Sequence, residues 1–245
     1  MVHFSVRGGV SVGFSLWVSA GGVAFWSCRS NLVSGCGAPL VAGKLKRRFF
    51  MRIFVALDID DAIRQRIQRF IEGVSGFAPD ARWVRPESLH VTLKFVGEKP
   101  PEAVEQIQRA LSSLRLCPVE MSFRGYGFFP TAKAARVFWV GIECGSPLAE
   151  VAKAIDQSLK ALGIPQEEHA FTPHLTLARG GGRSGAPHRK KDDAATRNFH
   201  RLQEKLAALP TPDFGTMAAH EFFLYQSQLS QGGSRYTKIA SFTLM

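Results

Sequence analysis

The chain has 245 residues, of which 45% are hydrophobic and 21% charged, as in an ordinary globular protein with room for a sizeable core. Its formal net charge is +11; residues 1–50 supply six basic and no acidic side chains, which leaves a mildly basic +5 that fits, without specifying, a polyanionic partner such as RNA. Only Cys117 and Cys144 lie beyond residue 50, without Cys-x-x-Cys spacing, so neither a disulfide framework nor a zinc site is indicated.

Residues 1–50 differ in kind from the rest of the chain, being rich in Gly, Ser, Val and Phe without helical or strand periodicity. They could be a signal peptide, with Arg7 before an apolar run and a cleavage site at 18–20. They could be a membrane anchor, although Gly and Ser interrupt the roughly 18 apolar residues that a span needs. We favour a third interpretation, in which translation starts at Met51: a leader at 1–50, non-native or disordered, and one domain at 51–245.

Apolar periodicity predicts a series of strands and helices in the rest of the chain. In order, we expect a buried strand at 52–58, a helix at 62–71, an extended piece at 82–84, a strand at 89–96, a helix at 100–114, strands at 119–128 and 135–142, a helix at 147–163, a strand at 171–178, a helix at 201–209, and strands at 221–225 and 235–244. Residues 180–196, glycine-rich and basic, are typical of a mobile loop. This loop could contact RNA phosphates or simply be solvated.

Two local features refine these expectations. Gly125, Gly127 and Pro130 should break the strand at 119–128 into a loop. The run Val-Phe-Trp-Val at 137–140 is apolar enough to be buried on both faces. The order of strands and helices in the second half of the chain approximately repeats that in the first half, which predicts an α+β fold of two pseudo-symmetric lobes. Each lobe would be a mainly antiparallel sheet with helices on its outer face, and a cleft would lie between them.

One four-residue pattern occurs twice, as His-Val-Thr-Leu at 90–93 and His-Leu-Thr-Leu at 174–177. In a strand, residues two apart share a face, so each His would lie beside its Thr while the apolar residues point into the core. If the two strands face each other across the cleft, two imidazoles and two hydroxyls meet. One imidazole can take a proton and the other give one, and the hydroxyls can hold oxygens, which suits a phosphate ester.

These motifs and their flanks resemble a known family. Arg82–Gly97 resembles the first signature of the two-histidine (2H) phosphoesterases, and in particular of the bacterial and archaeal RNA 2′,3′-cyclic phosphodiesterases, once called 2′-5′ RNA ligases. Thr172–Arg179 resembles the second signature, including an Arg five residues after the His. The resemblance extends over 51–245; the long basic loop after Arg179 departs from it.

The resemblance implies roles for individual residues. His90 would give a proton to the leaving O3′ of a ribose 2′,3′-cyclic phosphate, and His174 would accept one from water, leaving a 2′-phosphate. Thr92 and Thr176 would bind the phosphate oxygens, and Arg179 would offset the charge of the pentacoordinate state. Because the motifs are nearly symmetric, the sequence alone does not decide which His is the donor.

Other expectations concern neighbours and partners. Phe95, five residues after His90, could stack on a base or pack in the core, and Phe54 is expected in the core. We expect no metal and no cofactor, RNA ends or nucleotides with a 2′,3′-cyclic phosphate as partners, no membrane contact, a cytoplasmic location and a monomer. A 2′-5′ ligase side activity is compatible with the same groups. The alternatives are an esterase of another substrate, such as ADP-ribose 1″,2″-cyclic phosphate, and a non-catalytic nucleotide-binding module.

Overall fold

The structure is a computed structural model that describes residues 50–180, 191–230 and 233–245. The leader expected at 1–50 lies outside the described residues except for Phe50, as does the stretch 181–190 of the expected basic loop. The side chains at 191–198, 229, 230 and 233 are also outside the description.

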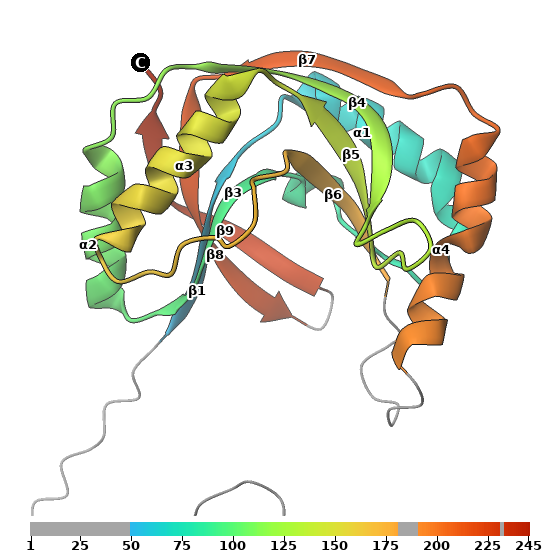
Figure 1. The fold of residues 1–245 in the computed structure, drawn as a ribbon, viewed down its shortest axis with the longest axis horizontal. Coiled ribbons are helices and arrows are strands. Elements are labelled where there is room, and N and C mark those ends of the chain that lie inside the picture. The colour runs from blue at the N-terminus through green and yellow to red at the C-terminus, as the bar shows by residue number, and fades with distance from the viewer. Residues whose placement is uncertain (1–49, 181–190, 231–232) are drawn as a thin grey trace, which may run out of the picture. The chain divides into compact units, whose positions relative to one another are not determined.

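The strands form one antiparallel sheet, which confirms the expected α+β class. They are β1 Met51–Leu57, β2 Arg82–Trp83, β3 Val91–Lys99, β4 Val119–Phe129, β5 Val137–Glu143, β6 His174–Arg179, β7 Asp213–Ala219, β8 Glu221–Ser230 and β9 Gly233–Thr243. Their order across the sheet is β7-β4-β5-β6-β3-β1-β8-β9, with β2 paired to β6. The sheet is strongly curved and arches in Figure 1.

The two expected lobes are the two four-stranded halves of this sheet. They join where β3 and β6 meet at the single pair Val91↔Leu175. The strands that carry the His-Thr motifs are therefore neighbours in one sheet, and do not face each other from separate sheets as we expected. β2 pairs with the rest of the same edge of β6, at Arg179 and Ala178.

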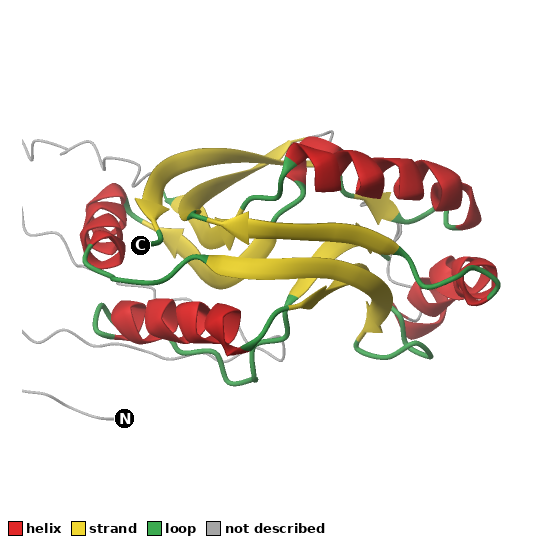
Figure 2. Ribbon diagram, turned by 90° about the horizontal axis from the view of Figure 1, so that it is seen from above, coloured by secondary structure: helices red, strands yellow, loops and turns green. Residues whose placement is uncertain are grey.

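Helices cover the outside of the arch, as Figures 1 and 2 show. They are α1 Asp61–Val74, α2 Pro101–Ser112, α3 Ser146–Lys160 and α4 Lys191–Ala207, with short turns η1 Ser75–Phe77 and η2 Pro86–Ser88. α3 packs on β3 and α1 on β7, so each half of the sheet is covered in part by a helix from the other half. Among the described helices, none combines the length and apolar character that crossing a membrane requires.

The core lies between the helices and the convex face of the sheet. Val91 and Leu175, paired at the junction, are fully buried, as is Leu177. The apolar positions of both motifs thus point where the alternation predicted. Phe54 is also buried, at 3% exposure, but it belongs to a separate small cluster with Tyr225 on the other face.

Two expectations about single strands were wrong. β4 continues through Gly125 and Gly127, because Gly125 takes a positive φ of 67° at a bulge and the ladder to β5 resumes beyond it. β5 is buried on one face only: Phe138 and Val140 are inaccessible, whereas Trp139 between them is half-buried on the concave face.

Two further differences concern the C-terminal third. α4 begins at Lys191, ten residues before the expected start, so part of the expected loop at 180–196 is helical. β7 at Asp213–Ala219 was not expected, because its sequence, Asp-Phe-Gly-Thr-Met-Ala-Ala, has one β-branched residue and a glycine in its interior. β4 supplies its hydrogen-bonded neighbour.

Candidate active site

A bulge in β3 decides which side chains join His90 and Thr92 on the concave face. Between Thr92 and Lys94, β3 carries one residue more than its partner β1. Leu93 and Lys94 consequently both turn inward and are buried, and Phe95 returns to the concave face, where it is 57% exposed. A core position for Phe95 is therefore ruled out.

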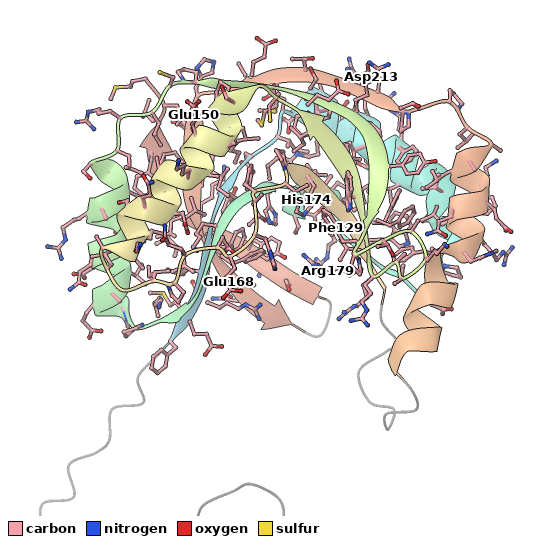
Figure 3. All side chains as sticks on the ribbon, in the orientation of Figure 1. Phe129, Glu150, Glu168, His174, Arg179 and Asp213 are labelled. Carbon is pink, nitrogen blue, oxygen red and sulfur yellow. The ribbon has the colours of Figure 1, made fainter. Side chains whose placement is uncertain are left out.

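β6 has a β-bulge at the matching position. The register against β5 gains one residue between Thr176 and Ala178, so Leu177 and Ala178 are both buried. Arg179 is then exposed on the face of His174 and Thr176, whereas strict alternation would have turned it into the core. Figure 3 shows His174 and Arg179 on the inner side of the arch. The five expected residues of the two motifs thus share one face.

The two histidines are held in the same way. Nδ1 of His90 lies 2.8 Å from the carbonyl oxygen of Ser88, and Nδ1 of His174 lies 2.8 Å from that of Thr172. A carbonyl oxygen only accepts, so each Nδ1 carries the donated hydrogen. In both rings Nε2 is therefore the atom left to exchange a proton with a ligand.

The local environment lowers the pKa of both imidazoles. For His90, burial is the main cause; the hydrogen bond to the carbonyl and the charge of Asp58 oppose it, and Arg179 and His174 add to it. For His174, burial again dominates, with Arg179 lowering the pKa further. His90 thus senses both His174 and Arg179, which places the three within electrostatic reach of one another.

An acidic group lies on the His90 side. Asp58 directly follows β1, and its Oδ1 accepts a hydrogen bond from the Tyr225 hydroxyl at 2.9 Å. Its Oδ2 lies 2.5 Å from Nζ of Lys238, which sits over the ring of Phe223. Burial and Asp58 raise the pKa of Tyr225, so its phenol stays protonated. No sequence motif predicts the cluster of Asp58, Tyr225 and Lys238, because these residues come from three strands or strand ends that are far apart in the chain.

Aromatic rings enclose His90. The ring of Phe54 is 4.9 Å from the imidazole, and Tyr236 meets it edge-on at 5.0 Å. A pocket of about 640 Å³ opens beside His90, with Asp58 and Lys238 in its lining. It gives a ligand at His90 room to extend toward Asp58 and Lys238.

A different aromatic pair flanks His174. Phe129 meets its ring edge-on at 4.9 Å, and Trp139 stacks on Phe129 with 4.9 Å between ring centroids. Figure 3 shows Phe129 beside His174 and Arg179. Gly127 lies against the indole of Trp139 and leaves no room for a Cβ atom. The sequence did not predict this aromatic pair beside His174, because β5 was wrongly expected to be buried on both faces.

Together these groups can bind and protonate an anionic ester. On the concave face, the two motifs offer two ring nitrogens for proton exchange, two threonine hydroxyls and the exposed guanidinium of Arg179. Within residues 50–180, 191–230 and 233–245, no three His, Cys, Asp or Glu side chains are grouped to hold a metal ion. The expectation of metal-free chemistry stays a prediction, which assay in a chelator tests.

Known proteins resemble this chain in sequence and in fold. Residues 57–139 and 142–236 match the model of a family described as LigT like phosphoesterase. The RNA 2′,3′-cyclic phosphodiesterase of Archaeoglobus fulgidus is 32% identical over 192 residues, covering 78% of this chain and 99% of that protein. The enzyme of the same name from Methanothermobacter thermautotrophicus is 30% identical over 196 residues, covering 79% and 99%. A crystal structure described as a phosphoesterase, 26% identical, superposes with a TM-score of 0.63 over 80% of this chain and 99% of its own.

Proposed function

Since the chain belongs to the family of LigT-like phosphoesterases, we propose that it hydrolyses the 2′,3′-cyclic phosphate of RNA ends or nucleotides to a 2′-phosphate. The observation that carries this proposal is the shared concave face of His90 and His174, with both Nδ1 atoms committed to carbonyls and both Nε2 atoms left for the substrate. Relatives that are covered almost completely by this chain carry the corresponding enzyme name.

In the proposed reaction, Nε2 of neutral His174 takes a proton from water as its oxygen bonds to phosphorus. The bond between phosphorus and O3′ breaks, and Nε2–H of protonated His90 gives its proton to O3′. The product is a 2′-phosphate, and the two rings exchange protonation states before the next turnover. The hydroxyls of Thr92 and Thr176 and the guanidinium of Arg179 bind the non-bridging oxygens, where negative charge grows in the pentacoordinate state.

The surroundings of the two rings support this division of roles. The carboxylate of Asp58 favours the protonated form of His90, as a proton donor requires. The charge that acts on His174 is the cation Arg179, which favours the neutral form that a proton acceptor needs. This difference supports the assignment of His90 as proton donor and His174 as proton acceptor.

Phe95 is the proposed stacking surface for a base. It is exposed, on the concave face, with its ring centroid 6.1 Å from that of Phe54. Stacking on aromatic side chains tolerates any base, which suits an enzyme that acts on ends of varied sequence. The partner in this proposal is an RNA end or nucleotide of the cytoplasm, bound by a monomer.

The test is incubation with adenosine 2′,3′-cyclic phosphate, with an oligonucleotide ending in a cyclic phosphate, and with ADP-ribose 1″,2″-cyclic phosphate, all in EDTA. We expect 2′-phosphate products from the first two, identified by ³¹P NMR. Turnover of the ADP-ribose ester alone would favour the alternative esterase, and binding without turnover a nucleotide-binding module. Formation of a 2′-5′ junction from separate oligonucleotide ends would show the reverse, ligase activity.

A further inference from the structure

The short strand β2 places a second arginine beside the site. β2 pairs with β6 so that Arg82 is opposite Arg179 and Trp83 is opposite Ala178. Residues directly opposite in an antiparallel pair point to the same face, with Cα atoms about 4.5–5.5 Å apart. Ala178 is fully buried, and Trp83 turns inward, where its Nε1 donates to the carbonyl of Ala78 at 3.1 Å. Arg82 therefore extends from the concave face, next to Arg179.

This pairing leaves two positive charges side by side. Like charges opposite each other across a ladder destabilise the sheet. Neither the Arg82 nor the Arg179 guanidinium forms an ion pair or hydrogen bond with the described part of the chain, and both side chains are exposed. Two neighbouring guanidinium groups form an anion-binding surface that is large enough for more than one phosphate group.

The two arginines differ in their position relative to the histidines. Arg179 lowers the pKa of both His90 and His174, so its charge acts where the cyclic phosphate would react. Arg82 pairs with the end of β6 that is away from His174, and it is not among the charges that act on either ring. A group bound to Arg82 is thus next to the reacting phosphate but separate from it.

We propose that Arg82 binds the phosphate that links the terminal nucleotide to its 5′ neighbour, and thereby makes the site prefer RNA ends over mononucleotides. This rests on the proposed function, because that function sets the position of the reacting phosphate. A nucleoside 2′,3′-cyclic phosphate has only one phosphate and gains nothing from Arg82. An RNA end presents a second one, one nucleotide away, and a guanidinium can hold it with two parallel hydrogen bonds.

The experiment compares two substrates in the Arg82→Gln variant. One is adenosine 2′,3′-cyclic phosphate, and the other is the dinucleotide ApA ending in a 2′,3′-cyclic phosphate. We expect kcat/KM to fall about tenfold for the dinucleotide, as loss of a hydrogen bond to a charged group implies, and to stay within about twofold for the mononucleotide. The slope of log KM against log salt concentration should also fall by about one for the dinucleotide.

The matched control is Arg69→Gln, an exposed arginine of α1 that lines no part of the site and should leave both substrates unchanged. Equal losses on both substrates, or no loss on either, would overturn the assignment of Arg82. Binding is measured in parallel, with fluorescently labelled ApA carrying a 2′-phosphate and with adenosine 2′-phosphate as a competitor. If the wild type turns over neither substrate, the proposed function fails, while selective weakening of ApA binding by Arg82→Gln would still support the subsite.

Discussion

The hydroxyl of Tyr225 donates a hydrogen bond to Oδ1 of Asp58 at 2.9 Å, and so fixes a carboxylate on the His90 side of the concave face. Lys238 holds the other oxygen of the same carboxylate. Lys238 is not among the charges that act on His90, whereas Asp58 is and raises its pKa. The network thus places a negative charge near His90, whereas the charge that acts on His174 is that of Arg179.

The first prediction rests on that asymmetry. In the proposed mechanism, activity requires neutral His174 and protonated His90, so kcat/KM should rise with pH through the pKa of His174 and fall as pH passes that of His90. Both values are lowered from about 6.5, so both limbs should lie on the acid side of neutrality. Asp58→Asn removes the charge that favours protonated His90, and the descending limb should move to lower pH. The loss of kcat/KM should be about three- to tenfold at pH 7 and smaller in acid.

Tyr225→Phe is the companion variant, because it removes the donor but leaves the carboxylate. Its descending limb should stay closer to that of the wild type, and NMR titration of the His90 ring gives the same order of pKa values without reference to turnover. A pH-independent loss in Asp58→Asn, with an unchanged His90 titration, would show that Asp58 only supports the fold.

The second prediction concerns the histidines themselves. Replacing either His90 or His174 by Gln should cost about 10²- to 10⁴-fold in kcat, because in the proposed mechanism each supplies general acid or base catalysis. The double variant should lose much less than the product of the two, since the groups act as a unit. His200→Gln is the control, an exposed ring beside Glu204 on α4. Near-normal turnover in a single variant with native circular dichroism would remove that residue from the mechanism.

The sequence predicted the placement of the two motifs better than that of the residues around them. A two-residue period places His and Thr of each motif on one face, and the structure has them there. The same period would turn Phe95 and Arg179 inward, and only the bulges after Thr92 and Thr176 turn them out. A bulge depends on the partner strand, which no local pattern reveals. Arg179 could be placed beforehand by family resemblance alone.

The long-range features were also beyond local reasoning. The neighbouring positions of β3 and β6 rest on the single pair Val91↔Leu175, whose members are far apart in the chain. Asp58, Tyr225 and Lys238 meet only because β1, β8 and β9 are adjacent in the sheet. Hydrophobic periodicity locates strands and helices, but it carries no information about which strands pair.

The third prediction uses the contact of Gly127 with Trp139. A Cβ at residue 127 would overlap the indole, so Gly127→Ala should displace Trp139 and, through it, Phe129 and the ring of His174. We expect kcat to fall about tenfold or more, as small misplacements of catalytic groups do, and stability to fall by about 1–3 kcal/mol. Gly73→Ala in α1 is the control: a Cβ there meets nothing within 4 Å, and the helix should gain up to about 1 kcal/mol. Equal activity in the two variants would show that Trp139 and Phe129 do not hold the ring of His174 in position.

The fourth prediction concerns the stretch that leads into His174. The bulge turns Lys94 inward, where its Nζ lies 2.6 Å from Oδ1 of Asp156 and 2.7 Å from the carbonyl oxygen of Pro165. Lys94→Met leaves that carboxylate without its cation and should lower the free energy of unfolding by about 3–5 kcal/mol, measured by urea denaturation. Glu167, 55% exposed and 3.4 Å from the same Nζ, supplies the control, since Glu167→Gln should cost about 1 kcal/mol or less. The double variant Lys94→Met, Asp156→Leu should recover most of the loss, because no buried charge is then left unpaired. If Lys94→Met alone were as stable as wild type, the ion pair would not hold the segment between Pro165 and His174 against α3.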